Sequence, residues 1–246
     1  MISKSGRVVI ITGATGNIGS KITKEFSRDG WNIAVAYHKN KCKAMELVEE
    51  IIHDGHSDAA AWNIDLSDIR MLESMVNGII QRWKRIDVLI NNASISRDGL
   101  VLKMSLDDWE KVLTVNLTGS FNLLRMTSRI MMKQRDGHII NIASLLGLKG
   151  SIGASNYAAS KAALISLSQS AAKELGRFNV RVNAVLPGFH KSSINENADK
   201  KIIEQAKNDS LLHCTTDPRE LAEFILFISK TKSITGQIFN CDSRVL

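Results

Sequence analysis

The chain has 246 residues, of which 44% are hydrophobic and 23% charged, and its formal net charge is +7 at pH 7. These proportions are those of a globular protein with a sizeable core and do not indicate disorder. Lys and Arg are spread along the whole chain without an aromatic-basic motif, which argues against nucleic-acid binding. A basic surface still favours anionic ligands.

The sequence contains no export signal, and no apolar run approaches the roughly 20 residues that cross a bilayer. Its three cysteines, Cys42, Cys214 and Cys241, are odd in number and far apart, unlike a disulfide framework. We therefore expect a cytoplasmic protein without membrane insertion.

Short apolar runs alternate with longer segments of helical period along the whole chain. In chain order, the pattern predicts a strand at 7–12, a helix at 17–28, a strand at 33–36, a helix at 42–53, a strand at 59–64, a helix at 69–83, a strand at 87–90, a helix at 106–134, a strand at 138–143, a helix at 154–176, a strand at 180–186, a helix at 218–229 and a strand at 237–240. This alternation predicts a single α/β domain over residues 1–246, with a doubly wound parallel sheet of about seven strands and helices on both faces.

Residues 189–212 interrupt this alternation after the sixth predicted strand. They are polar and poorly periodic except at 200–207. We expect a lid-like insertion here, and lids lie near ligands.

A glycine-rich turn from Gly13 to Gly19 follows the first predicted strand and opens the first helix. Glycines allow the backbone to approach a pyrophosphate closely, and the helix N-terminus supplies free N–H groups. The turn therefore predicts a dinucleotide site, with an ordinary strand-to-helix loop as the alternative when the turn is considered alone.

The end of the second predicted strand, Tyr37-His38-Lys39, carries no carboxylate. Enzymes that use NAD normally place an acid there for the adenosine ribose. His38 and Lys39, with Lys41 and Lys43 nearby, are suited instead to a 2′-phosphate. We favour NADP(H) over NAD(H); the alternative is that these side chains only solvate a helix start.

Tyr157 and Lys161 are four residues apart in a helical segment, so they share one helix face. An ammonium beside a tyrosine favours the phenolate and lowers the tyrosine pKa. Asn91 follows the fourth predicted strand and Ser144 follows the fifth, at the sheet edge where ligands of such folds bind. This placement, more than the spacing, distinguishes Tyr157 and Lys161 from a surface pair.

These features together resemble the short-chain dehydrogenase/reductase family over essentially the whole chain. The matching positions are the turn at 12–19, Asp65, Asn91-Asn92-Ala93, Asn116, Ser144, Tyr157, Lys161 and Pro187-Gly188. The resemblance implies a Rossmann fold. The scattered histidines predict no metal site: His53 and His56 flank Asp54-Gly55 at a helix end without partner ligands nearby, and we expect them to be solvated.

The resemblance also implies a role for each matching residue. Tyr157 would be the general acid of a reduction, and Ser144 would hydrogen-bond the substrate carbonyl. Lys161 would bind the nicotinamide ribose and lower the pKa of Tyr157, and Asn116 would hold a water that supplies protons to Lys161. The implied cofactor contacts are Gly13, Thr15, Asn17, Ile18, Gly19, Tyr37, His38, Lys39, Asp65, Leu66, Asn91, Ala93, Tyr157, Lys161, Pro187, Gly188 and Ser192.

The chain departs from the family pattern at four places. The middle glycine of the turn is Gly16, one position earlier than in most compact members, and Ser94 replaces a usual glycine after Ala93. Ser192 stands where a threonine is common. Ser243-Arg244 replaces Gly-Gly at an edge that forms subunit contacts in tetrameric relatives. We expect a homo-oligomer, a tetramer or else a dimer.

Residues 157–173 and 180–189 are most similar to members that reduce 3-oxoacyl groups on an acyl-carrier protein in fatty-acid synthesis. In those members, basic residues on neighbouring helices usually receive the acidic carrier. The candidates here are Arg129, Lys133, Arg135, Lys173 and Arg177. The alternative for each of them is that it only solvates a helix face. The atypical Phe189-His190-Lys191 leaves other β-ketoacyl, polyketide-like or small ketone and alcohol substrates open. A non-catalytic dinucleotide-binding protein and a nucleic-acid-binding protein are the alternatives from other classes.

Overall fold

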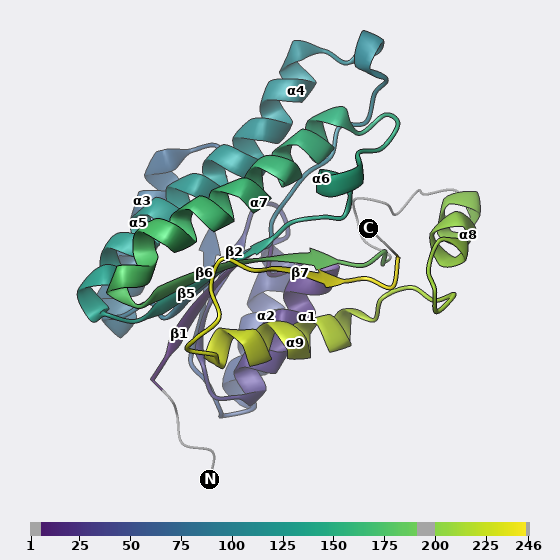
Figure 1. Ribbon diagram of the computed structural model, residues 1–246. Coiled ribbons are helices and arrows are strands. Elements are labelled where there is room, and N and C mark those ends of the chain that lie inside the picture. The colour runs from purple at the N-terminus through teal and green to yellow at the C-terminus, as the bar shows by residue number, and fades with distance from the viewer. Residues whose placement is uncertain (1–5, 191–199, 245–246) are drawn as a thin grey trace.

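The computed structural model describes residues 6–190 and 200–244, within which seven parallel strands form one sheet in the order β3-β2-β1-β4-β5-β6-β7 (Figure 1). The strands are β1 (Val8–Thr12), β2 (Asn32–Tyr37), β3 (Ala59–Asn63), β4 (Val88–Asn91), β5 (Gly137–Ile142), β6 (Val180–Pro187) and β7 (Ile238–Cys241). The strand order reverses between β1 and β4. Ligands of open parallel sheets bind beyond the carboxyl ends of the strands at such a switch point.

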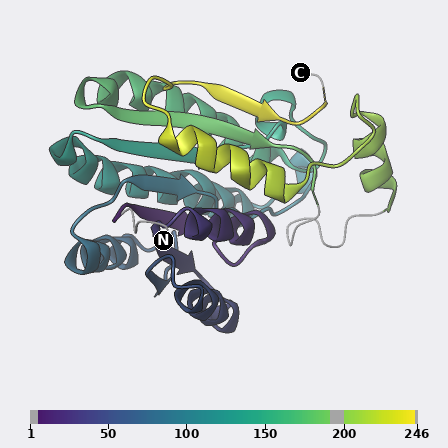
Figure 2. The same ribbon diagram turned by 90° about the horizontal axis from the view of Figure 1, so that it is seen from below.

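Helices cover both faces of the sheet (Figures 1 and 2). One face carries α1 (Asn17–Arg28), α2 (Lys41–His53) and α9 (Pro218–Lys230). The other carries α3 (Ile69–Trp83), α5 (Ser120–Gln134) and α7 (Ser155–Leu175). The remaining helical elements are the 3₁₀ turn η1 (Val101–Lys103), α4 (Leu106–Leu113), the π segment η2 (Thr114–Gly119), α6 (Leu146–Lys149), the 3₁₀ turn η3 (Gly176–Phe178) and α8 (Lys200–Asn208).

The strands are apolar on both faces because both faces are covered. Val9 and Ile11 of β1 pack under α1 and α2, whereas Val8 and Ile10 pack on the opposite side. Fully buried parallel strands have such continuous apolar runs. The predicted doubly wound α/β fold is therefore confirmed.

Polar caps determine where several helices begin. Asp68, Ser105 and Asp217 each accept a hydrogen bond from a backbone N–H of the helix that follows, α3, α4 and α9 respectively. Such caps satisfy N–H groups that have no partner within the helix. None of the helices in the described ranges is long and apolar enough to cross a membrane.

The continuous helix predicted over 106–134 is wrong in one respect, because the π segment η2 separates α4 from α5. The buried residues Val112, Asn116, Ser120 and Leu123 are spaced by four, four and three. This spacing matches an ordinary α-helix. The sequence pattern therefore gives no sign of the wider π turn. Gly119 ends the segment, and a Cβ there would lie 2.6 Å from the Leu66 carbonyl oxygen.

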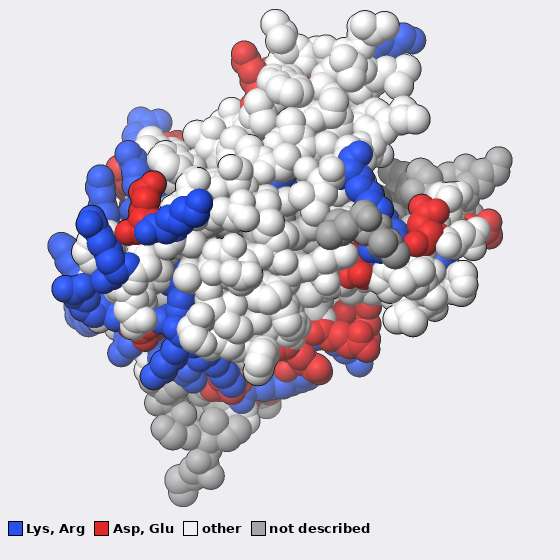
Figure 3. All heavy atoms as spheres, viewed as in Figure 1, with Lys and Arg blue, Asp and Glu red and all other residues white. Residues whose placement is uncertain are grey.

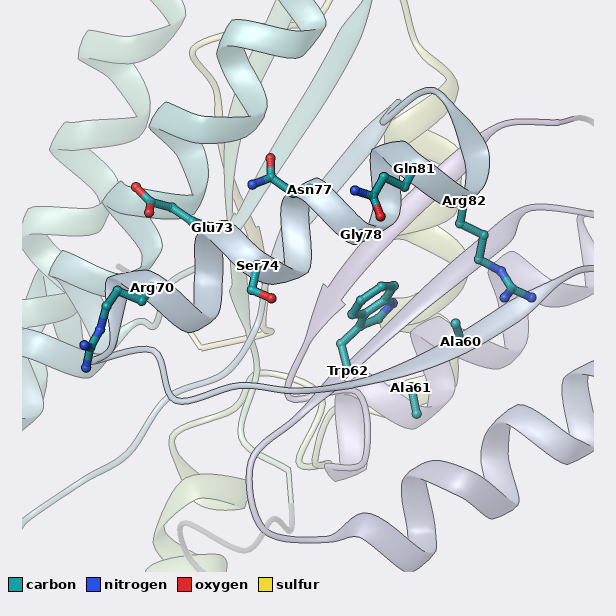
Figure 4. Close-up of a pocket in the computed structure, with 10 residues that line it drawn as sticks. All are labelled: Ala60, Ala61, Trp62, Arg70, Glu73, Ser74, Asn77, Gly78, Gln81 and Arg82. Carbon is teal, nitrogen blue, oxygen red and sulfur yellow. The ribbon is translucent and has the colours of Figure 1, made fainter.

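A groove lies between α3 and β3, the edge strand of the sheet (Figure 4). The Trp62 ring of β3 lies against Gly78 of α3, where a Cβ would be only 2.4 Å from a ring carbon. None of the predicted site residues lines this groove. It is a feature of the sheet edge, separate from the switch point.

Candidate active site

The glycine-rich turn brings the start of α1 against the end of β1. Gly13 has a φ of +62°, and the Gly16 N–H donates to its carbonyl oxygen at 3.0 Å. A Cβ at Gly19 would lie 2.2 Å from the same oxygen. The first turn of α1 has no side-chain cap and no acidic residue, which leaves it suited to an anionic pyrophosphate.

Thr12 and Asn92 tie this turn to the end of β4. The backbone N–H groups of Asn92 and Ala93 donate to Thr12 Oγ1 at 2.9 and 3.0 Å. The Asn92 side-chain amide donates to the carbonyls of Thr12 and Gly13 at 2.9 and 3.2 Å. Both strands of the switch point therefore hold the turn in one position.

The predicted adenosine end lies where β2 and β3 end. His38 and Lys39 are exposed, and Tyr37 is buried below them. His38 Nδ1 is 3.1 Å from the Ile64 carbonyl oxygen. Asp65 accepts from the Ser67 hydroxyl and N–H, which together with nearby His38 and Lys111 lowers its pKa.

This end also carries the N-terminus of α2. Lys39, Lys41 and Lys43 are exposed around it, and no acidic residue lies in its first turn. The helix N-terminus and the lysine side chains both favour a phosphate. The donor set therefore fits a dinucleotide with an additional phosphate.

Tyr157 lies in the first turn of α7, partly buried, with Ser144 of the segment after β5 as a hydrogen-bond partner. Close packing of α6 on α7 holds Tyr157 beside the segment that carries Ser144. A Cβ at Gly147 of α6 would lie only 2.8 Å from the Lys161 carbonyl carbon of α7. Ser144 Oγ also accepts from the Leu146 N–H at 3.2 Å. The structure thus brings Ser144 and Tyr157 together, and their predicted catalytic roles stay predictions.

Lys161 is one of the most deeply buried polar side chains, with 2% of its surface exposed. Its Nζ donates to the Ile142 carbonyl oxygen at 2.7 Å and lies 5.6 Å from the centroid of the Tyr157 ring. Burial disfavours the ammonium and lowers the Lys161 pKa to about 7.

The pKa of Tyr157 differs from the sequence expectation. Burial raises it above the usual 10, although hydrogen bonds from Ser144 and Ser94 oppose the rise. Lys161 is itself shifted toward its neutral form and bonds a carbonyl, so it does not deliver the full stabilising charge that its spacing suggested. Spacing on a helix reports proximity and not the burial that sets both pKa values.

Asn116, in the π segment, contacts the loop that follows β4 and not Lys161. Its side-chain Oδ1 accepts from the Ile95 N–H at 2.8 Å, and its Nδ2 donates to the Ile95 carbonyl at 2.9 Å. Nδ2 also lies 3.1 Å from Ser160 Oγ. The predicted water relay through Asn116 stays a prediction.

Asn91 lies inside the sheet with 2% of its surface exposed. Its amide donates to Asn141 Oδ1 and to the Ser120 carbonyl at 2.9 and 3.2 Å. Asn141 in turn donates to Ser168 Oγ of α7 at 2.8 Å. This side chain joins β4, β5 and α7, and its predicted cofactor contact stays a prediction.

Pro187 ends β6 beside β7, and Gly188 follows it. A Cβ at Gly188 would lie 1.6 Å from Thr216 Oγ1, and the Thr216 N–H donates to the Phe189 carbonyl at 3.0 Å. Part of the expected lid forms α8, beyond the carboxyl ends of the strands (Figure 1). Ser192 lies outside the described residues.

The remaining predicted contacts lie around the same edge. Thr15, Asn17 and Ile18 belong to the glycine-rich turn and the start of α1, and Leu66 is buried against Gly119. Sequence reasoning missed Thr12, Asn92 and Ser94 as site residues. Thr12 and Asn92 belong to matched motifs and Ser94 directly follows one, which is the signal that could have identified them. Among the described residues, no group of three His, Cys, Asp or Glu side chains is arranged to hold a metal ion.

Comparison with known proteins agrees with this geometry. The sequence profile of the short chain dehydrogenases matches residues 7–203. The chain is 39% identical to the 3-oxoacyl-[acyl-carrier-protein] reductase FabG of Thermotoga maritima, with 98% of each chain covered. It is 36% identical to the 3-oxoacyl-[acyl-carrier-protein] reductase of Synechocystis, covering 100% of this chain and 99% of the relative. It is also 36% identical to FabG of Staphylococcus aureus, covering 95% and 96%. The chain belongs to the short-chain dehydrogenase family.

Proposed function

We propose that this chain is an oxidoreductase that uses NADPH to reduce the ketone of a 3-oxoacyl-[acyl-carrier-protein] to the 3-hydroxyacyl product in fatty-acid synthesis. The observation that carries the proposal is the contact between Tyr157 and Ser144 at the carboxyl edge of the sheet, beside buried Lys161. Relatives of nearly the same length are named for this reaction.

The nicotinamide cofactor supplies the hydride in this reaction. The Tyr157 hydroxyl donates its proton to the carbonyl oxygen of the substrate, and the Ser144 hydroxyl donates a hydrogen bond to the same oxygen. The other groups hold the cofactor: the turn from Gly13 to Gly19 binds its pyrophosphate, and Lys161 binds the nicotinamide ribose.

The preference for NADP(H) rests on the residues at the end of β2. Lys39, Lys41 and Lys43 surround the N-terminus of α2, and Tyr37-His38-Lys39 provides no carboxylate for the ribose hydroxyls. With acetoacetyl thioester as substrate, we expect kcat/KM to be at least tenfold higher with NADPH than with NADH, because a favourable phosphate contact contributes about one power of ten or more. Equal efficiencies would reject this assignment.

The reductase activity is tested by following NADPH oxidation with acetoacetyl thioester. Replacing Tyr157 by Phe removes only the hydroxyl, so kcat should fall by about a hundredfold or more, the usual contribution of a general acid. NADPH binding to the variant, measured by fluorescence, should be preserved. Full activity of Tyr157→Phe would reject the proposed acid, and inactivity of the wild type on any ketone would favour a non-catalytic dinucleotide-binding protein.

The substrate class is tested by comparing 3-oxoacyl groups on the carrier protein with free 3-oxoacyl thioesters and small ketones. Arg129, Lys133, Arg135, Lys173 and Arg177 are all exposed and form the proposed carrier-binding group, called the basic end below. Figure 3 shows Lys and Arg gathered at the end of the molecule where α5 and α7 end. The basic end thus offers positive charge to an acidic carrier.

The basic end lies far from Tyr157 of the same chain. Tyr157 begins α7 and Arg177 follows its end, and a helix of 21 residues is about 30 Å long. The exposed positions of α7 between Tyr157 and Lys173 are uncharged, namely Ala162, Ser166, Gln169 and Ser170. We propose that a second copy packs antiparallel on this face in a homo-oligomer, a tetramer or else a dimer, so that the basic end of one copy serves the Tyr157 of the other.

We also propose that the protein acts in the cytoplasm. All three cysteines are free thiols in the structure, two of them exposed. Exposed thiols are typical of a reducing compartment.

A further inference from the structure

Asn156, the residue before Tyr157, lies in the first turn of α7 and has no exposed surface. Its side-chain Oδ1 accepts from the Tyr157 N–H at 2.7 Å. Its Nδ2 donates to the carbonyl oxygens of Arg97 and Asp108 at 2.8 and 3.4 Å. Since an N–H can only donate and a carbonyl can only accept, these partners fix the orientation of the amide. Asn156 therefore joins Tyr157 to the loop after β4 and to the start of α4.

The backbone of Tyr157 is bound by side chains at both its N–H and its carbonyl. The N-cap residue of α7 is Ala154, which has no side-chain oxygen for the first N–H groups of the helix. The Asn156 side chain binds the N–H of Tyr157 instead. The Ser160 hydroxyl donates to the Tyr157 carbonyl oxygen at 2.7 Å. The position of Tyr157 at the start of the helix thus depends on these two side chains.

The loop after β4 is itself fixed to its surroundings. The Gly99 N–H donates to the Gly153 carbonyl oxygen, just before α7, at 2.7 Å. Nearer β4, the Asn116 side chain binds the N–H and the carbonyl of Ile95 at 2.8 and 2.9 Å. The Arg97 carbonyl lies between these two anchors along the chain, so the Asn156 amide has a fixed acceptor.

We propose that Asn156 is a positioning residue for Tyr157. Its amide ties the backbone of Tyr157 to the loop after β4 and to α4, which holds the phenol at one place relative to the substrate carbonyl. The inference rests on the proposed function, because the exact position of the Tyr157 hydroxyl matters for activity only if that hydroxyl transfers a proton.

Removing the amide should displace Tyr157 from this position. In Asn156→Ala, the Tyr157 N–H and the Arg97 carbonyl lose this partner, and unpaired buried groups are costly. The first turn of α7 can regain hydrogen bonds by shifting or by admitting water. A shift of about 1 Å at a reacting group can lower a rate about a hundredfold. Catalysis should therefore respond more strongly than folding.

The activity test follows NADPH oxidation with acetoacetyl thioester. Asn156→Ala should lower kcat about tenfold to a hundredfold, while the KM for NADPH stays within about twofold because the glycine-rich turn is unchanged. Asn156→Ser is a milder change: its hydroxyl can accept from the Tyr157 N–H, but its one proton cannot serve both carbonyls. Its kcat should fall about threefold to tenfold, which gives a result even if Asn156→Ala does not fold.

Asn183→Ala is the matched control for a purely structural role. Asn183 of β6 also has no exposed surface. Its Oδ1 accepts from the Gln237 N–H at 2.9 Å, and its Nδ2 donates to the Ile234 carbonyl at 3.0 Å. Thermal unfolding should show a loss of stability in both alanine variants, but only Asn156→Ala should lose activity. An equal loss of kcat in Asn183→Ala would overturn the inference, as would wild-type kcat in Asn156→Ala or Asn156→Ser.

A second readout follows Tyr157 directly. The chain has only two tyrosines, Tyr37 and Tyr157, so tyrosine carrying a carbon-13 label at Cζ gives two NMR signals, and Tyr37→Phe identifies that of Tyr157. The Tyr157 signal should move or broaden in Asn156→Ala and Asn156→Ser and stay in place in Asn183→Ala. An unchanged signal in both Asn156 variants would contradict the inference. An active Tyr157→Phe would instead reject the proposed acid, whereas the NMR signal would still report whether Asn156 holds Tyr157 in place.

Discussion

Lys161 places a titratable amine where water does not reach. It is buried to 2% exposure, and its Nζ bonds the Ile142 carbonyl. Burial lowers its pKa from 10.5 to about 7. Between those two pH values, the unfolded chain binds a proton that the folded chain does not.

The lowered pKa makes stability depend on pH. Since the unfolded state binds more protons between pH 7 and 10.5, the free energy of unfolding should rise with pH across this window. Below pH 7 the amine is protonated in both states, and the destabilising effect of the buried charge is fully present. Lys161→Met should therefore be more stable than the wild type at pH 7, with an advantage that shrinks toward pH 9.5.

Urea unfolding of the cofactor-free proteins at several pH values measures this difference. Lys173→Met, an exposed lysine on the same helix, is the matched control and should leave the pH slope unchanged. Parallel stability curves for the wild type and Lys161→Met would contradict the assignment. The substitution should also abolish reductase activity, which separates the functional effect of the side chain from its effect on stability.

The N-terminal turn of α1 depends on a close contact that only glycine permits. A Cβ at Gly19 would be 2.2 Å from the Gly13 carbonyl oxygen and 2.9 Å from the Ala14 Cα. Because both atoms belong to the backbone, the start of α1 must shift to accept a methyl group. That shift moves the N–H groups proposed to bind the pyrophosphate.

Gly19→Ala should therefore weaken NADPH binding by about tenfold or more, although alanine favours helices by about 1 kcal/mol. Fluorescence titration with NADPH measures the affinity. Gly176→Ala is the control, because its Cβ meets nothing within 4 Å and its φ is −56°. Gly176→Ala should bind NADPH normally; equal affinities for Gly19→Ala and the wild type would show that the turn tolerates the shift.

The helices and strands were predictable because each buried strand is a short apolar run, and each flanking helix is a longer segment whose apolar residues recur at helical spacing. Tyr157, Lys161 and Ser144 were predictable because of their order along the chain. The π segment was not, since its buried residues keep helical spacing. The hydrogen-bond partners of Asn116 and the deep burial of Lys161 were also not predictable, because both depend on elements that are distant in sequence.

The basic end and Tyr157, the proposed general acid, lie at opposite ends of α7. The basic end is near Arg135 and Arg177, which flank the Phe178 ring at 5.7 and 4.8 Å from its centroid. Arg135→Glu should raise KM for a carrier-bound substrate about tenfold at low salt, with less effect at high salt, and leave free thioesters unaffected. Arg28→Glu, in α1 on the opposite face of the sheet, is the control and should change neither the KM for carrier-bound substrate nor that for free thioester.

Mixed oligomers distinguish docking on the same copy from docking on its partner. Tyr157→Phe keeps the basic end but lacks the acid, whereas Arg135→Glu keeps the acid but has a damaged basic end. If the carrier docks on one copy and is reduced by the other, coexpression of the two variants should restore about a quarter of wild-type activity on carrier-bound substrate, because half of the pairs are mixed and each has one complete site. Docking and reduction on the same copy would give no recovery, since neither chain holds both parts. Arg135→Glu should reduce free thioester without a partner variant. The activity of each preparation on free thioester therefore reports how many copies carry an intact Tyr157, and the activity on carrier-bound substrate is divided by it.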